Sequence, residues 1–160
     1  MRDPRVSILL PVRNGMATLA RALDSLRGQT LPDWELVAVD DGSADGTGEF
    51  LQAAARRDPR IRVFSRPAQG LVPALNAGLA VARAPAVARM DADDEMLPTR
   101  LERQADWLER HPDVGLVSCR VEFGGDRASA AGYARHVDWL NAQLTPEEMA
   151  LRRFVEAPVA

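Results

Sequence analysis

The fold is decided by the stretch Ala88-Arg89-Met90-Asp91-Ala92-Asp93-Asp94-Glu95-Met96-Leu97-Pro98, in which an apolar run from Ala84 to Met90 ends in three aspartates. Such a run predicts a buried strand that brings acidic side chains to the edge of a sheet. Because side chains alternate in an extended chain, Asp91 and Asp93 would point the same way, about 6 to 7 Å apart along the strand. Two such carboxylates suit Mg²⁺ or Mn²⁺ better than Zn²⁺, which prefers nitrogen and sulfur ligands. These ions usually bridge to a phosphate, so a diphosphate is the first ligand to expect.

A second acidic cluster, Asp40-Asp41-Gly42-Ser43, follows an earlier strand-like run, Leu36-Val37-Ala38-Val39. In an open parallel sheet both clusters would open on the carboxyl edge, where ligands bind. The alternative is that the acids after Met90 only cap the next helix, which Leu97-Pro98-Thr99 would begin. The second cluster favours a shared ligand site over this alternative.

Length and composition fit one compact α/β domain with a real core, since the chain has 160 residues, 46% of them hydrophobic, and a net charge of −3. Mixed charge and a pI near 5.4 give no support for nucleic-acid binding or for a polybasic membrane patch. The long apolar-biased stretch 70–90 is interrupted by Asn76, Arg83 and Pro85, so it does not predict a transmembrane helix. No signal-peptide pattern precedes Pro4.

Cys119 is the sole cysteine of the chain. An intramolecular disulfide and a cysteine-based zinc site are therefore excluded, and a reducing compartment is expected. Because Cys119 closes the apolar run 114–119, we expect a buried thiol without a catalytic role. The chain contains no lysine, which excludes a P-loop and a Schiff-base enzyme.

Apolar periodicity predicts strands that alternate with helices. The expected strands cover residues 5–10, 34–39, 61–64, 86–90 and 114–119, the last continuing to Phe123. The expected helices cover residues 16–28, 50–55, 71–82 and 98–111, and Thr145-Pro146-Glu147-Glu148 is a capping signature for a last helix to Phe154. Residues 11–15 form a candidate ligand loop, and residues 126–143 are expected to be rich in loops. This alternation predicts a right-handed, three-layer, Rossmann-like parallel sheet.

Six segments together resemble family 2 glycosyltransferases of the GT-A fold. They are Val6-Ser7-Ile8-Leu9-Leu10-Pro11-Val12-Arg13-Asn14, Ser25-Leu26-Arg27-Gly28-Gln29-Thr30, Trp34-Glu35-Leu36-Val37-Ala38-Val39-Asp40-Asp41-Gly42-Ser43, Asp45-Gly46-Thr47, Gly70-Leu71-Val72-Pro73-Ala74-Leu75-Asn76-Ala77-Gly78 and Arg89-Met90-Asp91-Ala92-Asp93-Asp94. The match covers roughly residues 5 to 119, in the order of the family's motifs. It implies a mainly parallel α/β fold of nucleotide-diphospho-sugar transferases, in which residues 1–160 form a single donor-binding domain and the acceptor half is missing.

The resemblance also implies a set of site residues. Those expected to contact the nucleotide-sugar are Pro11, Val12, Arg13, Asn14, Asp41, Gly70, Asn76, Asp91 and Ala92. Asp41 would accept a hydrogen bond from the base edge, and Asp91 would lie beside the ribose or a metal-bound water. Asp93, with Asp91, would bind the Mn²⁺ or Mg²⁺ that holds the donor diphosphate. Gly70 and Asn76 would shape the helix and loop under the nucleotide.

The implied activity is the metal-dependent, inverting transfer of a sugar from a nucleotide-diphosphate sugar, expected to be a UDP-sugar, to a glycan or lipid acceptor. The catalytic base stays unassigned, because relatives carry it beyond a stretch like residues 154–160. Leu75 stands where many relatives have an arginine, so no phosphate contact is expected from it. The expected location is the cytoplasm, at the inner face of the membrane, which the protein would reach peripherally or through a C-terminal part that this chain lacks.

Two alternatives stay open. One is a nucleotide-sugar-binding fragment without transfer activity, and the other is a non-enzymatic α/β signalling domain that binds Mg²⁺ or Ca²⁺. A receiver-type signalling domain would need a lysine late in the chain. The calcium-loop pattern that starts at Asp41 has Gln52 in place of the bidentate glutamate. His111 and His136 are expected to be surface residues, which leaves no base for a hydrolase.

Overall fold

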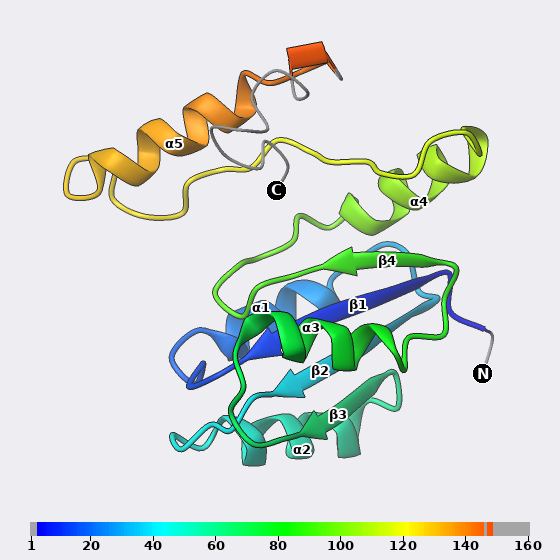
Figure 1. Cartoon of the computed structure of the whole chain (residues 1–160), viewed down its shortest axis with the longest axis vertical. Coiled ribbons are helices and arrows are strands. Elements are labelled where there is room, and N and C mark those ends of the chain that lie inside the picture. Colours follow the sequence, from blue (N-terminus) through cyan, green and yellow to red (C-terminus); the bar gives the residue numbers. More distant parts are fainter. Residues whose placement is uncertain (1–2, 146, 149–160) are drawn as a thin grey trace. The chain divides into compact units, whose positions relative to one another are not determined.

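The computed structural model describes residues 3–145 and 147–148 (Figure 1). The chain divides into two compact units, residues 1–110 and 111–160. The first unit contains β1 (Val6–Val12), α1 (Leu19–Arg27), β2 (Trp34–Asp40), α2 (Thr47–Arg57), β3 (Ile61–Ser65), α3 (Leu71–Leu79), β4 (Ala86–Arg89) and α4 (Arg100–Arg110). Strands and helices alternate along this unit, as the sequence predicts.

The strands of the first unit form a four-stranded sheet in the order β3-β2-β1-β4, and every neighbouring pair is parallel. Val12 of β1 lies beside Asp40 of β2, and Asp40 lies beside Ser65 of β3. The last pair of β4 joins Arg89 to Leu9 of β1. The prediction of a parallel sheet is confirmed, and all of these strands end at one edge of it.

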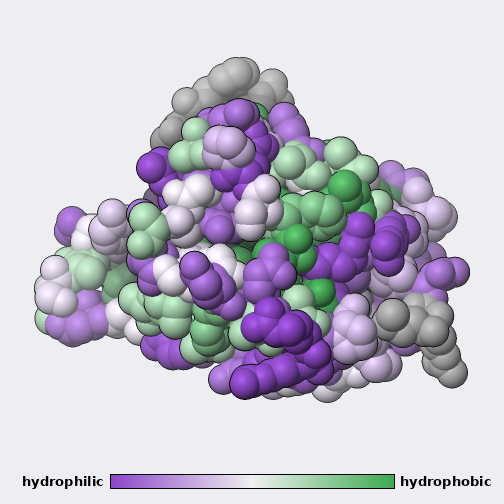
Figure 2. All heavy atoms as spheres, turned by 90° about the horizontal axis from the view of Figure 1, so that it is seen from below, coloured by the Kyte–Doolittle hydropathy of each residue, from purple (hydrophilic) through white to green (hydrophobic). Residues whose placement is uncertain are grey.

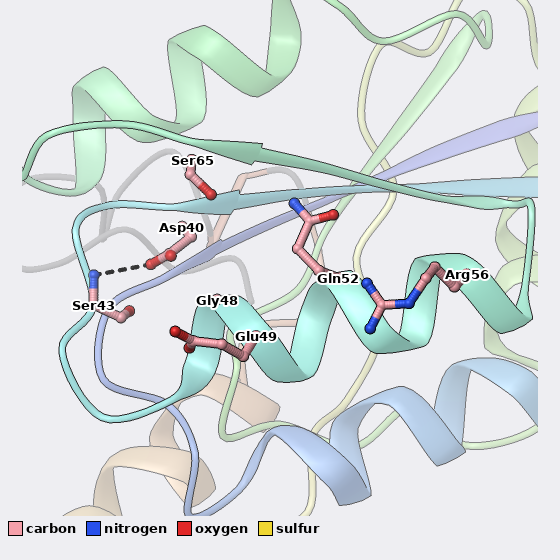
Figure 3. Close-up of a pocket in the computed structure, with 7 residues that line it drawn as sticks. All are labelled: Asp40, Ser43, Gly48, Glu49, Gln52, Arg56 and Ser65. Carbon is pink, nitrogen blue, oxygen red and sulfur yellow. Dashed lines mark hydrogen bonds between the residues drawn. The ribbon is translucent and has the colours of Figure 1, made fainter.

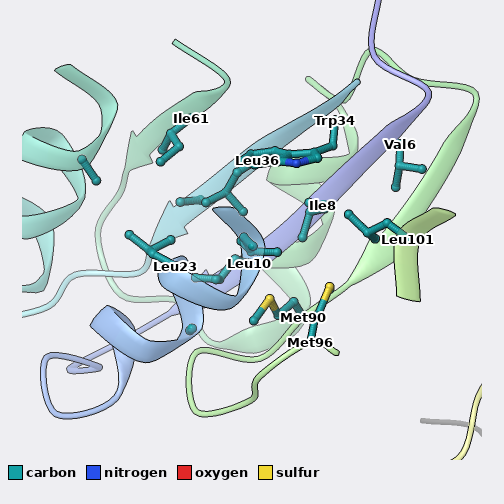
Figure 4. Close-up of a cluster of buried hydrophobic side chains, with 14 of the residues drawn as sticks. Val6, Ile8, Leu10, Leu23, Trp34, Leu36, Ile61, Met90, Met96 and Leu101 are labelled. Atoms are coloured by element: carbon teal, nitrogen blue, oxygen red, sulfur yellow. The ribbon is translucent and has the colours of Figure 1, made fainter. Parts of the chain in front are cut away.

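Two apolar layers cover the sheet. On one face, Ile8 and Leu36 belong to a buried cluster that also contains residues of α1, α2 and α4 (Figure 4). On the other face, Leu9 and Val37 pack with Ala74 of α3, and Figure 1 shows α3 and α1 on opposite sides of the strands. β1 and β2 are buried along their whole length. Burial on both faces explains why their sequences are continuous apolar runs.

α3 approaches the sheet closely because Gly78 has no side chain. A Cβ atom at this position would lie 3.3 Å from Val39 Cγ2 and 3.4 Å from Leu9 Cδ2. The first of these separations is tighter than an ordinary van der Waals contact, so a larger residue would require a shift of a few tenths of an ångström between the helix and the strands. The small residue therefore sets the spacing of this layer.

β1 continues to Val12, although the sequence predicts that it ends before Pro11. Proline lacks the N–H group that the interior of a strand needs. No ladder bond is lost here, because the last pair of β1 with β4 joins Leu9 to Arg89, two residues earlier. On the other side of the strand, Pro11 stays paired with Val39 of β2.

The second unit contains α5 (Ala131–Asn141), which contradicts the prediction that residues 126–143 are mainly loop. The sequence of α5 shows no clear period because the helix buries only Ala134. After α5, Thr145 Oγ1 accepts the N–H of Glu148 at 3.2 Å, and Glu148 Oε2 accepts the N–H of Thr145 at 3.0 Å. This reciprocal pair is the predicted capping signature, while residues 149–154 of the predicted helix lie outside the described residues.

The prediction of a fifth strand at residues 114–123 is wrong, because these residues form no strand. A strand needs a neighbouring backbone, whereas the N–H of Val121 donates to Asn141 Oδ1 at 2.9 Å and its C=O accepts Asn141 Nδ2 at 2.7 Å. Leu116 is 65% exposed. The thiol of Cys119 is exposed as well, so the prediction that it is buried is also wrong.

The surface shown in Figure 2 is largely polar, with smaller apolar patches between the polar side chains. Leu71, Val72 and Leu79 of α3 are among the exposed large apolar residues. Within residues 3–145 and 147–148, every helix is too short or too polar for a membrane span.

Candidate functional site

Four loops leave the carboxyl ends of the parallel strands at the same edge of the sheet. They cover residues 13–18 after β1, 41–46 after β2, 66–70 after β3 and 90–99 after β4. Neighbouring strands lie about 4.8 Å apart, and β1 separates β2 from β4, so the loops that carry the two acidic clusters leave the sheet about 10 Å apart. Both clusters therefore open on the edge where parallel sheets bind ligands.

The loop after β1 is held against the loop after β2 by short polar side chains. The N–H of Asn14 donates to Ser43 Oγ at 2.9 Å, and Asn14 Oδ1 accepts the N–H of Ala44 at 2.9 Å. The next two backbone N–H groups donate to Thr47 Oγ1 at 2.9 Å and to Asp45 Oδ2 at 3.1 Å. Asn14 has a φ of 55°, a left-handed conformation that asparagine tolerates better than most residues. The two loops thus act as one fixed body.

Asp41 is 4% exposed and holds the loop after β3. Its Oδ1 accepts the N–H of Gln69 at 3.0 Å, and its Oδ2 accepts the N–H of Gly70 at 2.7 Å. Burial opposes ionisation of this carboxyl, but these bonds and the charges of Arg66 and Arg13 outweigh it and lower its pKa. Asp41 is therefore an anion whose acceptor capacity is largely used by the chain itself.

The loop after β4 carries exposed carboxylates. Asp91 forms an ion pair with Arg89 at 3.0 Å, whereas the side chains of Asp93 and Asp94 make no hydrogen bond or ion pair within the described part of the chain. Desolvation and the neighbouring carboxylates of Asp91 and Asp93 raise the pKa of Asp94. α4 begins at Arg100, six positions after Asp94, so the alternative that these acids cap the helix is wrong.

This loop fits a hard divalent cation that shares its coordination with a phosphate ligand. In residues 3–145 and 147–148 no group of three His, Cys, Asp or Glu side chains could hold a metal ion by itself. Mg²⁺ and similar ions are usually held by one or two carboxylates together with substrate phosphates and water. Asp93 and Asp91 can supply such carboxylates, and their oxygens suit Mg²⁺ or Mn²⁺ better than Zn²⁺.

The structure places the predicted nucleotide residues of β1 partly in the core. Pro11 and Val12 are buried, whereas Arg13 is exposed. The loop after β4 lies beside this segment, since a Cβ atom on Gly15 would lie 3.4 Å from the Cβ of Ala92. Ala92 and the residues around Arg13 are therefore brought together, and their role in binding stays a prediction.

The two predicted residues of α3 lie at different depths. Gly70 precedes the helix with a φ of 95°, a conformation that favours glycine, and its N–H reaches Asp41. Asn76 is exposed on the helix, about 9 Å along the axis from Gly70 at 1.5 Å per residue. The geometry thus joins Gly70 to the edge, and the role of Asn76 stays a prediction.

A hollow that the sequence does not indicate lies beside β2, β3 and α2 (Figure 3). It has a volume of about 380 Å³ and is lined by Asp40, Ser43, Gly48, Glu49, Gln52, Arg56 and Ser65. Side chains alternate along β2, so Asp40 points toward α2 while Asp41 points toward the loop before α3. The pair of adjacent aspartates could have indicated this hollow, because neighbouring residues of a strand point to opposite faces of the sheet.

Known proteins are similar to this chain over most of its length. The family model described as Glycosyl transferase family 2 matches residues 7–157. EpsJ, an uncharacterized glycosyltransferase of Bacillus subtilis, is 35% identical over 116 residues, which are 72% of this chain and 33% of EpsJ.

Solved structures agree with this match. The mannosyltransferase PcManGT from Pyrobaculum calidifontis, in complex with GDP-Man and Mn²⁺, has a TM-score of 0.67 and 31% identity, covering 81% of this chain and 39% of that one. TarS 1-349 of S. aureus, in complex with UDP-GlcNAc, has a TM-score of 0.63 and 26% identity, covering 68% of this chain and 32% of that one. The chain spans less than half the length of these relatives.

Proposed function

Because the chain belongs to glycosyl transferase family 2 and has the GT-A fold of its structural relatives, we propose that its sheet edge is the donor site of a metal-dependent, inverting glycosyltransferase. The donor would be a nucleotide-diphosphate sugar, with a UDP-sugar as our first expectation, and the acceptor a glycan or a lipid. We expect the protein to work in the cytoplasm, at the inner face of the membrane.

The observation that carries this proposal is the meeting of fixed loops at one edge. The loop of Asn14 is held by the loop after β2 and by Thr47 of α2, and the loop of Gly70 is held by Asp41. The loop after β4 leaves the same edge about 10 Å from the loop after β2. A nucleotide-sugar is long enough to lie across these strands. PcManGT and TarS, which hold GDP-Man with Mn²⁺ and UDP-GlcNAc, support a ligand of this class.

Each loop would have its own part in binding. The backbone of residues 11–14 and the guanidinium of Arg13 would line the nucleotide, and the anionic Asp41 would fix the loop under it. Asp93 would hold the cation together with Asp91, whose position is supported by the ion pair with Arg89. When bound, such a cation neutralises the charge that develops on the departing diphosphate.

Nucleotide binding tests the proposal. Calorimetry with UDP, UDP-GlcNAc, GDP and GDP-mannose, each in MnCl₂ and in EDTA, should show binding that is tighter in MnCl₂ than in EDTA. Asp93→Asn should weaken that binding about tenfold or more, because a carboxylate ligand loses its charge. Asp106→Asn is the matched control, since Asp106 pairs with Arg5 at 2.8 Å, before the start of β1. Equal affinity of the wild type and Asp93→Asn in saturating Mn²⁺ would remove Asp93 from the site.

Transfer itself is a separate question. No described residue is assigned as the base that would activate the acceptor, and a positioned base contributes about 10²- to 10⁴-fold to the rate. The chain spans 32% to 39% of the two solved relatives named above, which favours a second outcome in which it binds the donor without transferring the sugar. A radiolabelled-sugar transfer assay, beside the binding measurement, separates the two.

A further inference from the structure

The acid loop, residues 91–95, is suspended between two buried methionines. Met90 is 1% exposed and Met96 is 4% exposed, and both belong to the same apolar cluster (Figure 4). The N–H of Met90 donates to the carbonyl of Leu9 at 3.0 Å, which ties the start of the loop to β1. The end of the loop is not part of the sheet, so something else must hold it.

Two polar side chains hold the end of the acid loop, Ser25 of α1 and Gln29, which follows the end of α1 by two residues. Ser25 Oγ accepts the N–H of Met96 at 3.0 Å. Gln29 is 8% exposed, and its Nε2 donates to the carbonyl of Leu97 at 2.9 Å and to that of Met96 at 3.3 Å. Its Oε1 accepts the N–H of Leu101 at 3.1 Å. The amide of Gln29 thus uses both its donor and its acceptor on the chain that follows the acid loop.

These bonds fix which residues after the acid loop lie beside Ser25 and Gln29. Gln29 Nε2 also donates to the carbonyl of Ser25 at 3.2 Å, so the two residues lie beside each other at the end of α1. A buried amide is costly unless its partners are in place, and those of Gln29 include separate backbone groups between Met96 and Leu101. Sliding the loop by one residue would break these bonds together. The exposed ion pair of Arg21 with Glu95, at 3.4 Å, adds little to this.

We propose that Gln29, with Ser25, is a positioning residue for the carboxylates of Asp91 and Asp93. It acts through the backbone of residues 96–101 and keeps the acid loop where a divalent cation can join these carboxylates to a nucleotide diphosphate. The inference rests on the proposed donor site. Mg²⁺-like ions need near-ideal geometry, so loosening the loop weakens the metal-dependent part of nucleotide affinity and spares the part that persists in EDTA.

The test compares Gln29→Met with Ser7→Ala in the full chain. Methionine keeps the length of glutamine but makes none of its hydrogen bonds. Ser7 is the control because its buried hydroxyl accepts the N–H groups of Arg83 and Ala84, at 3.1 and 3.0 Å, next to the start of β1 and away from the acid loop. Calorimetry with UDP and with GDP, in MnCl₂ and in EDTA, is paired with amide hydrogen exchange and with a melting curve.

Gln29→Met should weaken binding in MnCl₂ about tenfold, leave affinity in EDTA within about twofold, and speed exchange at the N–H groups of Met96 and Leu101. Ser7→Ala should lower the melting temperature without changing nucleotide affinity. If Gln29→Met does not fold, Ser25→Ala, which removes the acceptor of one N–H group, should give the same pattern more weakly.

The outcomes distinguish a failure of the role of Gln29 from a failure of the proposed donor site. Equal weakening in MnCl₂ and in EDTA, or unchanged exchange at Met96 and Leu101 in a folded variant, overturns the role of Gln29 while leaving the donor site intact. A wild-type chain that binds neither UDP nor GDP in MnCl₂ overturns the proposed function, and the positioning role with it.

Discussion

Replacing Glu35 by glutamine should destabilise the chain at neutral pH and should matter less in acid. Glu35 is 5% exposed at the start of β2. Its Oε1 accepts the hydroxyl of Ser7 and the N–H of Arg83, both at 2.7 Å, and its Oε2 accepts Nη1 of Arg62 at 2.9 Å. This carboxylate therefore joins β1, β2, β3 and the segment after α3 through one buried group.

The size of the effect follows from the group that is lost. Glutamine keeps the shape and one acceptor, but it loses the charge that Arg62 faces, and hydrogen bonds to charged groups contribute about 1.5 to 3 kcal/mol. At about 3 °C per kcal/mol for a chain of this size, the melting temperature should fall by about 5 to 9 °C. Asp24→Asn is the control, because Asp24 and Arg27 form an exposed pair, and its loss should change stability by less than about 0.5 kcal/mol.

The pH dependence gives the sharper test. Burial opposes ionisation of Glu35, but the bonds from Ser7, Arg62 and Arg83 outweigh it and lower its pKa from the ordinary 4.5. A carboxyl whose pKa is lowered by folding adds stability that is fully present above the unfolded pKa and is lost as pH falls through the folded pKa. Circular dichroism melts of the wild type and Glu35→Gln from pH 7 to pH 2 should show a difference in melting temperature that becomes smaller below the ordinary pKa. A difference in melting temperature that stays constant over this pH range would refute the reasoning.

Two further predictions concern other parts of the chain. Thr47→Val should lower stability by about 1 to 3 kcal/mol in urea unfolding, because the fully buried hydroxyl accepts the N–H of Gly15 and donates to Asp45; an unchanged midpoint would mean that the two loops are held by other contacts. Cys119 should react with a thiol reagent in the native chain at nearly the rate of a free thiol, and labelling that waits for unfolding would contradict its exposed position.

The location of both acidic clusters could be predicted because it depends on local pattern. Apolar runs ending at Val39 and at Met90 predict buried strands, and parallel strands necessarily end at a common edge. The structure confirms the strands and their direction. What Asp41 binds could not be predicted, since its partners are backbone N–H groups of residues 69 and 70, which carry no signature in the sequence.

The errors share a physical cause, which is the dependence of a strand on its neighbours. Pro11 is tolerated within β1 because the pairing with β4 has already ended at Leu9. The apolar run 114–119 has strand composition, yet in the described chain a side-chain amide, that of Asn141, takes the backbone groups of Val121 just beyond it. Period and propensity describe a segment alone, whereas a ladder is a property of two segments.

Most of the polar side chains in the segments that resemble family 2 glycosyltransferases form hydrogen bonds within the chain itself. Thr47 fixes the loop after β1, Asp41 fixes the loop after β3, and Gln29 fixes the segment after the acid loop. Ordering a loop on binding lowers affinity, and a loop held in advance avoids that loss. A sheet edge organised in this way leaves the exposed carboxylates of Asp93 and Asp94 with few partners of their own. The loops are thus held by hydrogen bonds within the chain, while the carboxylates of Asp93 and Asp94 stay available to a ligand. A cation shared between protein and phosphate requires this combination.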